Sequence, residues 1–166
     1  MSNVISSPWP PRSYTLGQIV LHWAIAALVV WQLLFGEEMQ VLEHPAGADA
    51  TDLFLANSHI WVGIAILALV VIRIALRLVH GAPPHDDSGR FTAMLSGATH
   101  LAFYVLLIAM PVTGLLAYFL ELPTGDIHQL GKPLFIVLIA LHVAATLWHQ
   151  FIRHDGILRR MLVPAR

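Results

Sequence analysis

The chain has 166 residues, of which 57% are hydrophobic and only 11% are charged. A soluble chain of this size could not cover its surface with so few charges, so the composition predicts an integral membrane protein with a single domain over residues 1–166. The formal net charge of −1 argues against a nucleic-acid partner, and the lack of cysteine excludes disulfides and cysteine-ligated iron–sulfur clusters.

Four apolar stretches follow one another along the chain, each long enough to cross a hydrocarbon core of about 30 Å. They cover residues 16–35, 59–79, 97–120 and 131–152. Helices are expected, because a single chain with four spans cannot satisfy its backbone groups as an open sheet. The predicted fold class is therefore an all-α bundle of four transmembrane helices within the lipid bilayer.

Charged residues are divided unevenly among the connections between these spans. The connections after the first and third spans are acidic and hold one base, Lys132. Eight of the nine Lys and Arg residues flank the opposite ends of the spans. By the positive-inside rule, both termini are expected to be cytoplasmic and the two acidic loops to face outward.

Ten histidines are an unusually high number for a chain of this length. Six lie in or at the ends of the spans: His22, His59, His100, His128, His142 and His149. An ionisable side chain inside a membrane is costly and usually functional, so each of the six is a candidate site residue. The other four lie in loops or the tail and are interpreted as solvated: His44, His80, His85 and His154.

Helical spacing sorts the histidines into pairs. His128 and His142 are fourteen residues apart, which places them on one face of the fourth span and about 21 Å apart along its axis. His22 is expected near the cytoplasmic level of the first span, and His59 at the outer entrance of the second. The predicted pairs are therefore His22 with His142 inside and His59 with His128 outside.

Each predicted pair is a candidate set of axial ligands for a haem held between helices, where bundles build cofactor sites. Small residues near the ligands, Ala26, Gly63 and Gly131, are expected to clear space for a flat ring, unless they serve only close helix packing. Two alternatives remain. The histidines could be polar groups bonded to neighbouring helices, or they could bind zinc or copper, although such sites usually gather three or four ligands at one level.

His100, His149 and Arg73 form a second group near the cytoplasmic ends of the helices. A quinone needs hydrogen-bond donors and proton exchange, and histidine supplies both. Arg73 is fourteen residues after His59 and could meet a haem propionate or a quinone carbonyl at the inner level. The alternatives are that either histidine is instead a haem ligand, or that these side chains reach the cytoplasmic interface.

Taken in order, these residues resemble the bacterial cytochrome b561 family of small four-helix membrane proteins. The resemblance extends over residues 14–164. Its matching segments are 21–23, 58–63, 71–78, 100, 110–115, 127–128, 141–142, 148–149 and 155–161.

The resemblance implies two haem b groups with bis-histidine ligation, and the matching ligand positions are His22, His59, His128 and His142. His100 and His149 match positions associated with quinone binding. Members of the family oxidise periplasmic superoxide and reduce ubiquinone in the bacterial inner membrane, or serve as electron-carrying anchors for other oxidoreductases. The connection over residues 121–131 is shorter than in superoxide-oxidising relatives.

A haem iron with two histidine ligands has no free axial position, which favours electron transfer. We expect an outer donor to reduce the outer haem, and the inner haem to reduce quinone beside His100, His149 and Arg73. Lys132, four residues after His128, is the candidate catalytic residue that would steer superoxide. The alternatives are a haem-bearing anchor for a partner oxidoreductase and a haem-free transporter whose histidines relay protons.

Overall fold

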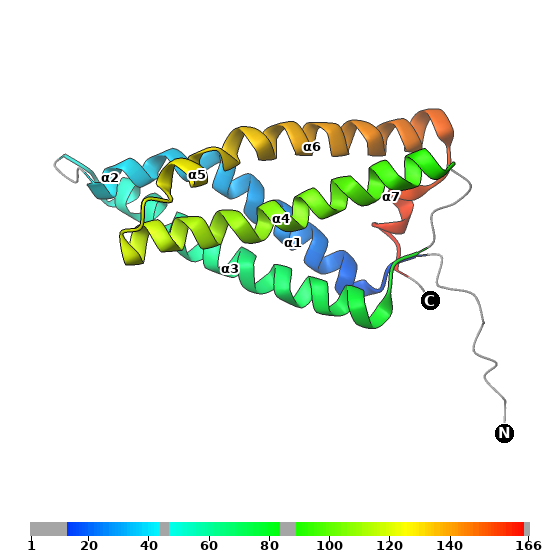
Figure 1. Cartoon of the computed structure of the whole chain (residues 1–166), viewed down its shortest axis with the longest axis horizontal. Coiled ribbons are helices and arrows are strands. Elements are labelled where there is room, and N and C mark those ends of the chain that lie inside the picture. Colours follow the sequence, from blue (N-terminus) through cyan, green and yellow to red (C-terminus); the bar gives the residue numbers. More distant parts are fainter. Residues whose placement is uncertain (1–12, 44–46, 84–88, 165–166) are drawn as a thin grey trace, which may run out of the picture.

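The computed structural model describes residues 13–43, 47–83 and 89–164 (Figure 1). Four long helices dominate it: α1 (Leu16–Phe35), α3 (Ala50–His80), α4 (Arg90–Leu120) and α6 (Gly131–Trp148). Shorter helical segments join or extend them: η1 (Gly36–Met39), α2 (Gln40–Glu43), α5 (Gly125–Gln129), η2 (His149–Arg153) and α7 (Ile157–Arg160). The predicted fold class, an all-helical bundle with four helices long and apolar enough to cross a membrane, is confirmed.

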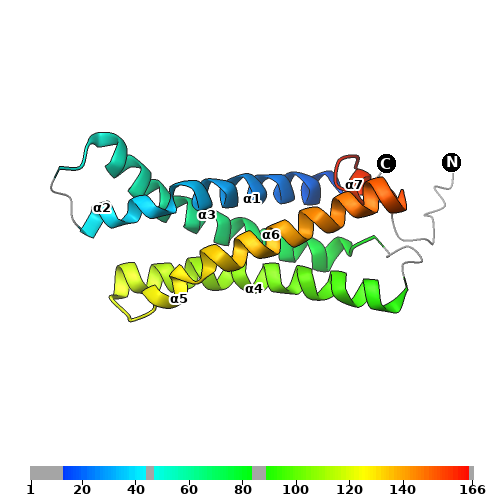
Figure 2. The ribbon, with the colours of Figure 1, turned by 90° about the horizontal axis from the view of Figure 1, so that it is seen from above.

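The long helices lie side by side in an elongated bundle (Figures 1 and 2). Helix α1 packs against α3, α3 against α4, and α4 against α6. One end of the bundle carries α2 and α5, and we call it the α5 end. The other carries α7, together with the start of α1 and the end of α6, and we call it the α7 end.

Capping residues set where the first two long helices begin. Thr15 and Gln18 form a capping box at the start of α1, and Asp49 and Asp52 form another at the start of α3. Because of the second box, α3 begins before the apolar stretch does, and His59 lies inside a helix rather than at its start. Gly81, whose φ of 71° suits glycine, ends α3.

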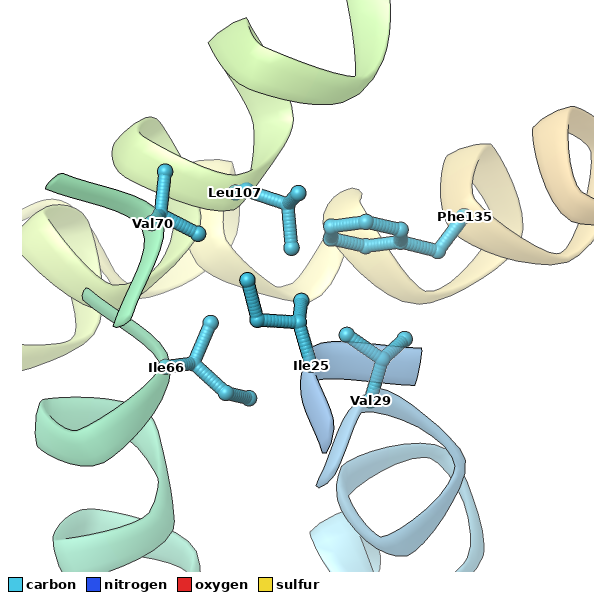
Figure 3. Packing of buried hydrophobic residues seen from close by; sticks show 6 residues of the cluster. All are labelled: Ile25, Val29, Ile66, Val70, Leu107 and Phe135. Carbon is cyan, nitrogen blue, oxygen red and sulfur yellow. The ribbon is translucent and has the colours of Figure 1, made fainter. Parts of the chain in front are cut away.

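A small apolar core joins the four long helices away from their ends, and Figure 3 shows six of its residues from close by. All four long helices contribute to it: Ile25, Val29, Ile66, Val70, Leu107 and Phe135. Most other large apolar side chains are exposed, for example Leu78 at 81%. Exposed apolar surface over this much of a molecule is typical of helices that face lipid.

Substituting Ile66 by alanine should destabilise the bundle by about 2 kcal/mol or more, because it leaves a cavity in a closely packed layer. Ile66 is 4% exposed, whereas Ile72 on the same helix is 49% exposed and provides the matched control. Thermal unfolding in detergent measures both variants. Equal losses for Ile66→Ala and Ile72→Ala would contradict this assignment of the core.

Candidate functional site

The structure brings four of the histidines together as two pairs, one at each end of the bundle. At the α5 end, the ring centres of His59 from α3 and His128 from α5 are 5.8 Å apart. At the α7 end, the ring centres of His22 from α1 and His142 from α6 are 6.5 Å apart. The helical spacing predicted both juxtapositions. His128 lies on α5, which Leu130 joins to α6 with helical backbone angles, so His128 and His142 belong to one candidate span, Gly125–Arg153.

These separations suit a single metal ion between the two rings. A metal bonded at about 2 Å to one nitrogen of each imidazole leaves the ring centres about 6 Å apart. In the described part of the chain, no group of three or more His, Cys, Asp or Glu side chains is arranged to hold a metal ion. Each pair therefore fits an ion whose other ligands arrive with it, as the porphyrin nitrogens do in haem.

The ring of His128 is oriented by the backbone of α4. Its Nδ1 donates a hydrogen bond to the carbonyl oxygen of Met110 at 2.8 Å, since a carbonyl can only accept. Histidines that bind metals usually make such a bond with the nitrogen away from the metal. The bond assigns the proton to Nδ1 and leaves Nε2 of His128 as the nitrogen for an iron atom.

Two glycines that sequence analysis did not select make room for the outer pair of rings. A Cβ atom on Gly114 would lie 2.9 Å from Cε1 of His128, and one on Gly36 would lie 3.3 Å from Cε1 of His59. A Cβ on Gly63 would meet Nε2 of Gln32, and one on Gly131 would meet Sδ of Met110, so both glycines pack against neighbouring side chains. The space for the two imidazole rings thus comes from glycines on facing segments. That Gly63 and Gly131 make room for a flat ring stays a prediction.

Helix α1 fixes the backbone of α3 at His59. Gln32 donates through Nε2 to the carbonyl oxygen of His59 at 2.9 Å, and Trp31 donates through Nε1 to Ser58 Oγ at 3.1 Å. Nδ1 of His59 is buried without a hydrogen-bond partner. A buried polar atom without a partner is costly, and such atoms occur where function requires them.

A third histidine joins the pair at the α7 end. The ring centre of His100, on α4, is 6.0 Å from that of His142. Nδ1 of His100 lies 2.7 Å from the carbonyl oxygen of Ser96, which assigns it a proton as in His128. Both His22 and His100 are therefore within reach of His142, and the spacing of rings alone does not choose between them as its partner.

Arg73 is half-buried at the same end and is bonded to α1. Its Nη1 donates to the carbonyl oxygen of Gln18 at 2.8 Å. Gln18 is itself buried and donates through Nε2 to the carbonyl oxygen of Gly81 at 3.0 Å. A small pocket beside Arg73 is lined by residues of α1, α3 and α4 and by the segment before α1: Tyr14, Gln18, Arg73, Arg77 and Tyr104.

His149 and Lys132 each have a charged partner that sequence analysis did not identify. Nδ1 of His149 bonds to Oδ2 of Asp155. Nζ of Lys132 forms an ion pair with Glu37 of η1, in which the side chains are 40% and 79% exposed. The pKa of the Glu37 carboxyl is held below its usual value, mainly by the hydrogen bond from Lys132 and also by the positive charge of Lys132. The opposite charge of Glu37 therefore offsets the cationic spot expected at Lys132.

Three named proteins are similar to this chain over almost their whole length. Cytochrome b562 of Cereibacter sphaeroides is 31% identical over 155 residues, which cover 91% of this chain and 96% of that protein. The probable superoxide oxidase CybB of Yersinia pestis is 25% identical over 182 residues, which cover 93% of this chain and 98% of that protein. Cytochrome b561 homolog 2 of Escherichia coli K12 is 26% identical over 178 residues, covering 92% of each.

The sequence model of one protein family, described as prokaryotic cytochrome b561, matches residues 13–164. This range contains all four long helices and every histidine of the two pairs. Membership of such a family accounts for apolar spans that carry facing histidines, because b-type haem is held by side-chain ligands inside the membrane. The chain therefore belongs to the prokaryotic cytochrome b561 family of bacterial membrane electron-transfer proteins, which carry haem b.

Proposed function

We propose that the chain holds two b haems, one between His59 and His128 and one between His22 and His142, and passes electrons from a donor at the α5 end to ubiquinone at the α7 end. The observation that carries the proposal is the presence of two facing histidine pairs at opposite ends of the bundle. When bound, haem would supply a one-electron redox change between the two histidines of each pair.

The apolar core separates the two proposed haem sites. On α4, His100 lies beside His142 of the inner pair, and Gly114 lies beside His128 of the outer pair. These two positions are fourteen residues apart, which is roughly 21 Å along a helix. The six buried core residues that lie between them have hydrocarbon side chains (Figure 3). Such a layer excludes water and protons, so electrons cross it alone and proton chemistry is confined to the ends.

Quinone reduction is assigned to the α7 end, which we place at the cytoplasmic face on the positive-inside rule. Arg153, Arg159 and Arg160 lie there, with Arg73 and Arg77. Arg73 supplies N–H donors for a carbonyl oxygen of a quinone, and His100 and His149 offer Nε2, through which a protonated ring donates a hydrogen bond and a proton.

Superoxide is the proposed donor at the α5 end, with Lys132 as the residue that attracts it. A relative named as a probable superoxide oxidase supports this choice. Glu37 competes for the charge of Lys132, and the surrounding loops are acidic. This acidic end favours a second candidate function, in which the chain is a haem-bearing membrane anchor that exchanges electrons with a cationic partner oxidoreductase.

Removal of either outer ligand should remove one of two haems. His128→Ala and His59→Ala are expected to lower the haem content from two to one per chain, because each removes one of the two histidines that would hold the outer haem. Reduced-minus-oxidised spectra with haem quantitation measure this. His80→Ala, at an exposed histidine at the end of α3, is the matched control and should retain both. Two haems in His128→Ala would refute the assignment of His128.

The partner of His142 is identified by comparing His22→Ala with His100→Ala. We expect His22→Ala to lose the inner haem, since it removes the proposed ligand. His100→Ala should keep two haems but reduce ubiquinone at least tenfold more slowly, because a donor to the quinone is lost. The measurements are haem content and the rate of haem oxidation by ubiquinone. The opposite pattern would make His100 the ligand.

Steering of superoxide is tested by freeing Lys132 from its partner. Glu37→Gln and Glu121→Gln remove the same charge at the α5 end, but only the first releases Lys132. We expect Glu37→Gln to raise kcat/KM for superoxide several-fold more than Glu121→Gln does. This gain should become smaller at higher salt concentration, because salt screens the charge of Lys132. Lys132→Glu should lower kcat/KM for superoxide. Stability should hardly change, since ion pairs exposed to solvent contribute little to it. Equal rates in all three variants would rule out steering and favour the anchor function.

A further inference from the structure

The end of α6 contains a turn that joins His149 to Asp155. The α-helix ends at Trp148, and a π-helical turn, η2, follows from His149 to Arg153. His154 then takes a left-handed conformation with φ of 54°, which reverses the chain. The backbone N–H of Asp155 donates to the carbonyl oxygen of His149 at 3.3 Å, and their side chains also bond. Single π-helical turns are rare and occur often at functional sites.

The His149–Asp155 pair is largely shielded from solvent, with side chains 14% and 18% exposed. Burial alone would raise the pKa of Asp155. The hydrogen bond from His149, the one from the backbone N–H of Ile157, and the nearby charge of Arg153 outweigh burial and hold that pKa below its usual value. Asp155 is therefore a carboxylate at neutral pH, and a carboxylate can only accept hydrogen bonds.

The charge of Asp155 decides which nitrogen of His149 takes part in proton exchange. Because Asp155 only accepts, Nδ1 of His149 must carry a hydrogen in both protonation states of the ring. Nε2 is then the nitrogen through which His149 can pass a proton to a substrate. Trp23 donates through Nε1 to the carbonyl oxygen of Met161 at 2.9 Å, which ties the segment after Asp155 to α1.

We propose that Asp155 is a positioning residue that holds His149 as the proton donor to the quinone at the α7 end, an inference that rests on the proposed function. The quinone takes two electrons, one at a time, from the reduced haem, one proton from His149 and a second proton from water at the α7 end. In the step assigned to His149, its Nε2–H bond breaks as an O–H bond forms on a quinone oxygen. The ring is left neutral with its hydrogen on Nδ1, Asp155 remains a carboxylate, and water at the α7 end restores the proton.

The test compares an acceptor that needs protons with one that does not. Purified, haem-loaded protein is reduced and mixed with ubiquinone-1 or with ferricyanide, which takes one electron and no proton, while haem oxidation is followed by stopped flow. Asp155→Asn keeps the size of the side chain and removes its charge. Its single amide oxygen can accept from Nδ1 of His149 or from the backbone N–H of Ile157 but not from both, because the carboxylate uses a different oxygen for each. We expect oxidation by ubiquinone-1 to slow about tenfold or more and oxidation by ferricyanide to stay unchanged.

His149→Gln should show the same contrast between acceptors. The double variant with Asp155→Asn should be no slower than His149→Gln alone, because Asp155 acts only through His149. Glu121→Gln, which removes a carboxylate at the α5 end, is the control and should match the wild type with both acceptors.

The outcomes separate this inference from the proposed function. If ubiquinone-1 oxidises the wild type and Asp155→Asn equally fast, the proposed role of Asp155 is refuted, while the proposal that ubiquinone is the electron acceptor is kept. Equal slowing with ferricyanide would mean that Asp155 supports only the fold. If the wild type is oxidised by ferricyanide but not by ubiquinone-1, the proposed acceptor fails, and the role of Asp155 fails with it.

Discussion

The hydrogen bond from His128 to the Met110 carbonyl oxygen is the contact on which the α5 end depends. It crosses from a short helix to the middle of a long one, and it orients a polar ring inside an apolar bundle. Two features of α4 accompany it. Pro111 lacks a backbone N–H and so interrupts the regular ladder of the helix at that level, and Gly114 leaves the space that the ring occupies. Neither feature is needed for α4 to cross a membrane.

The two ends of the bundle differ in their chemistry as well as their charge. The α5 end holds one pair of facing histidines beneath acidic loops, and its one described lysine is paired with Glu37. The α7 end holds three histidines with close ring contacts, a buried network around Gln18 and Arg73, and the His149–Asp155 pair. Groups able to exchange protons with a substrate thus gather at the end that we assign to quinone, while the apolar core lies between.

Hydrophobicity and helical period were enough to predict the spans and to pair the histidines by level. The first span was predicted at residues 16–35, which are the bounds of α1. The pairs His22–His142 and His59–His128 followed because helices of known direction and rise bring residues of equal depth together. The starts of α3 and α4 were less predictable. The capping box of Asp49 and Asp52 extends α3 beyond its apolar stretch, and α4 begins at Arg90 after Gly89, without a side-chain cap. That the four paired histidines bind haem remains a prediction.

The sequence by itself determined an apolar four-helix bundle with histidines at two levels, since both properties depend on composition and on regular spacing along a helix. Only the tertiary structure decided which partners hold those side chains. Glu37 and Lys132 are far apart in the chain, as are Gly114 and His128, so no local period connects them. His149 and Asp155 are close in sequence, but they meet only because a π-helical turn and a left-handed residue reverse the backbone between them. Such contacts depend on the path of the chain in space, which hydrophobic patterning does not specify.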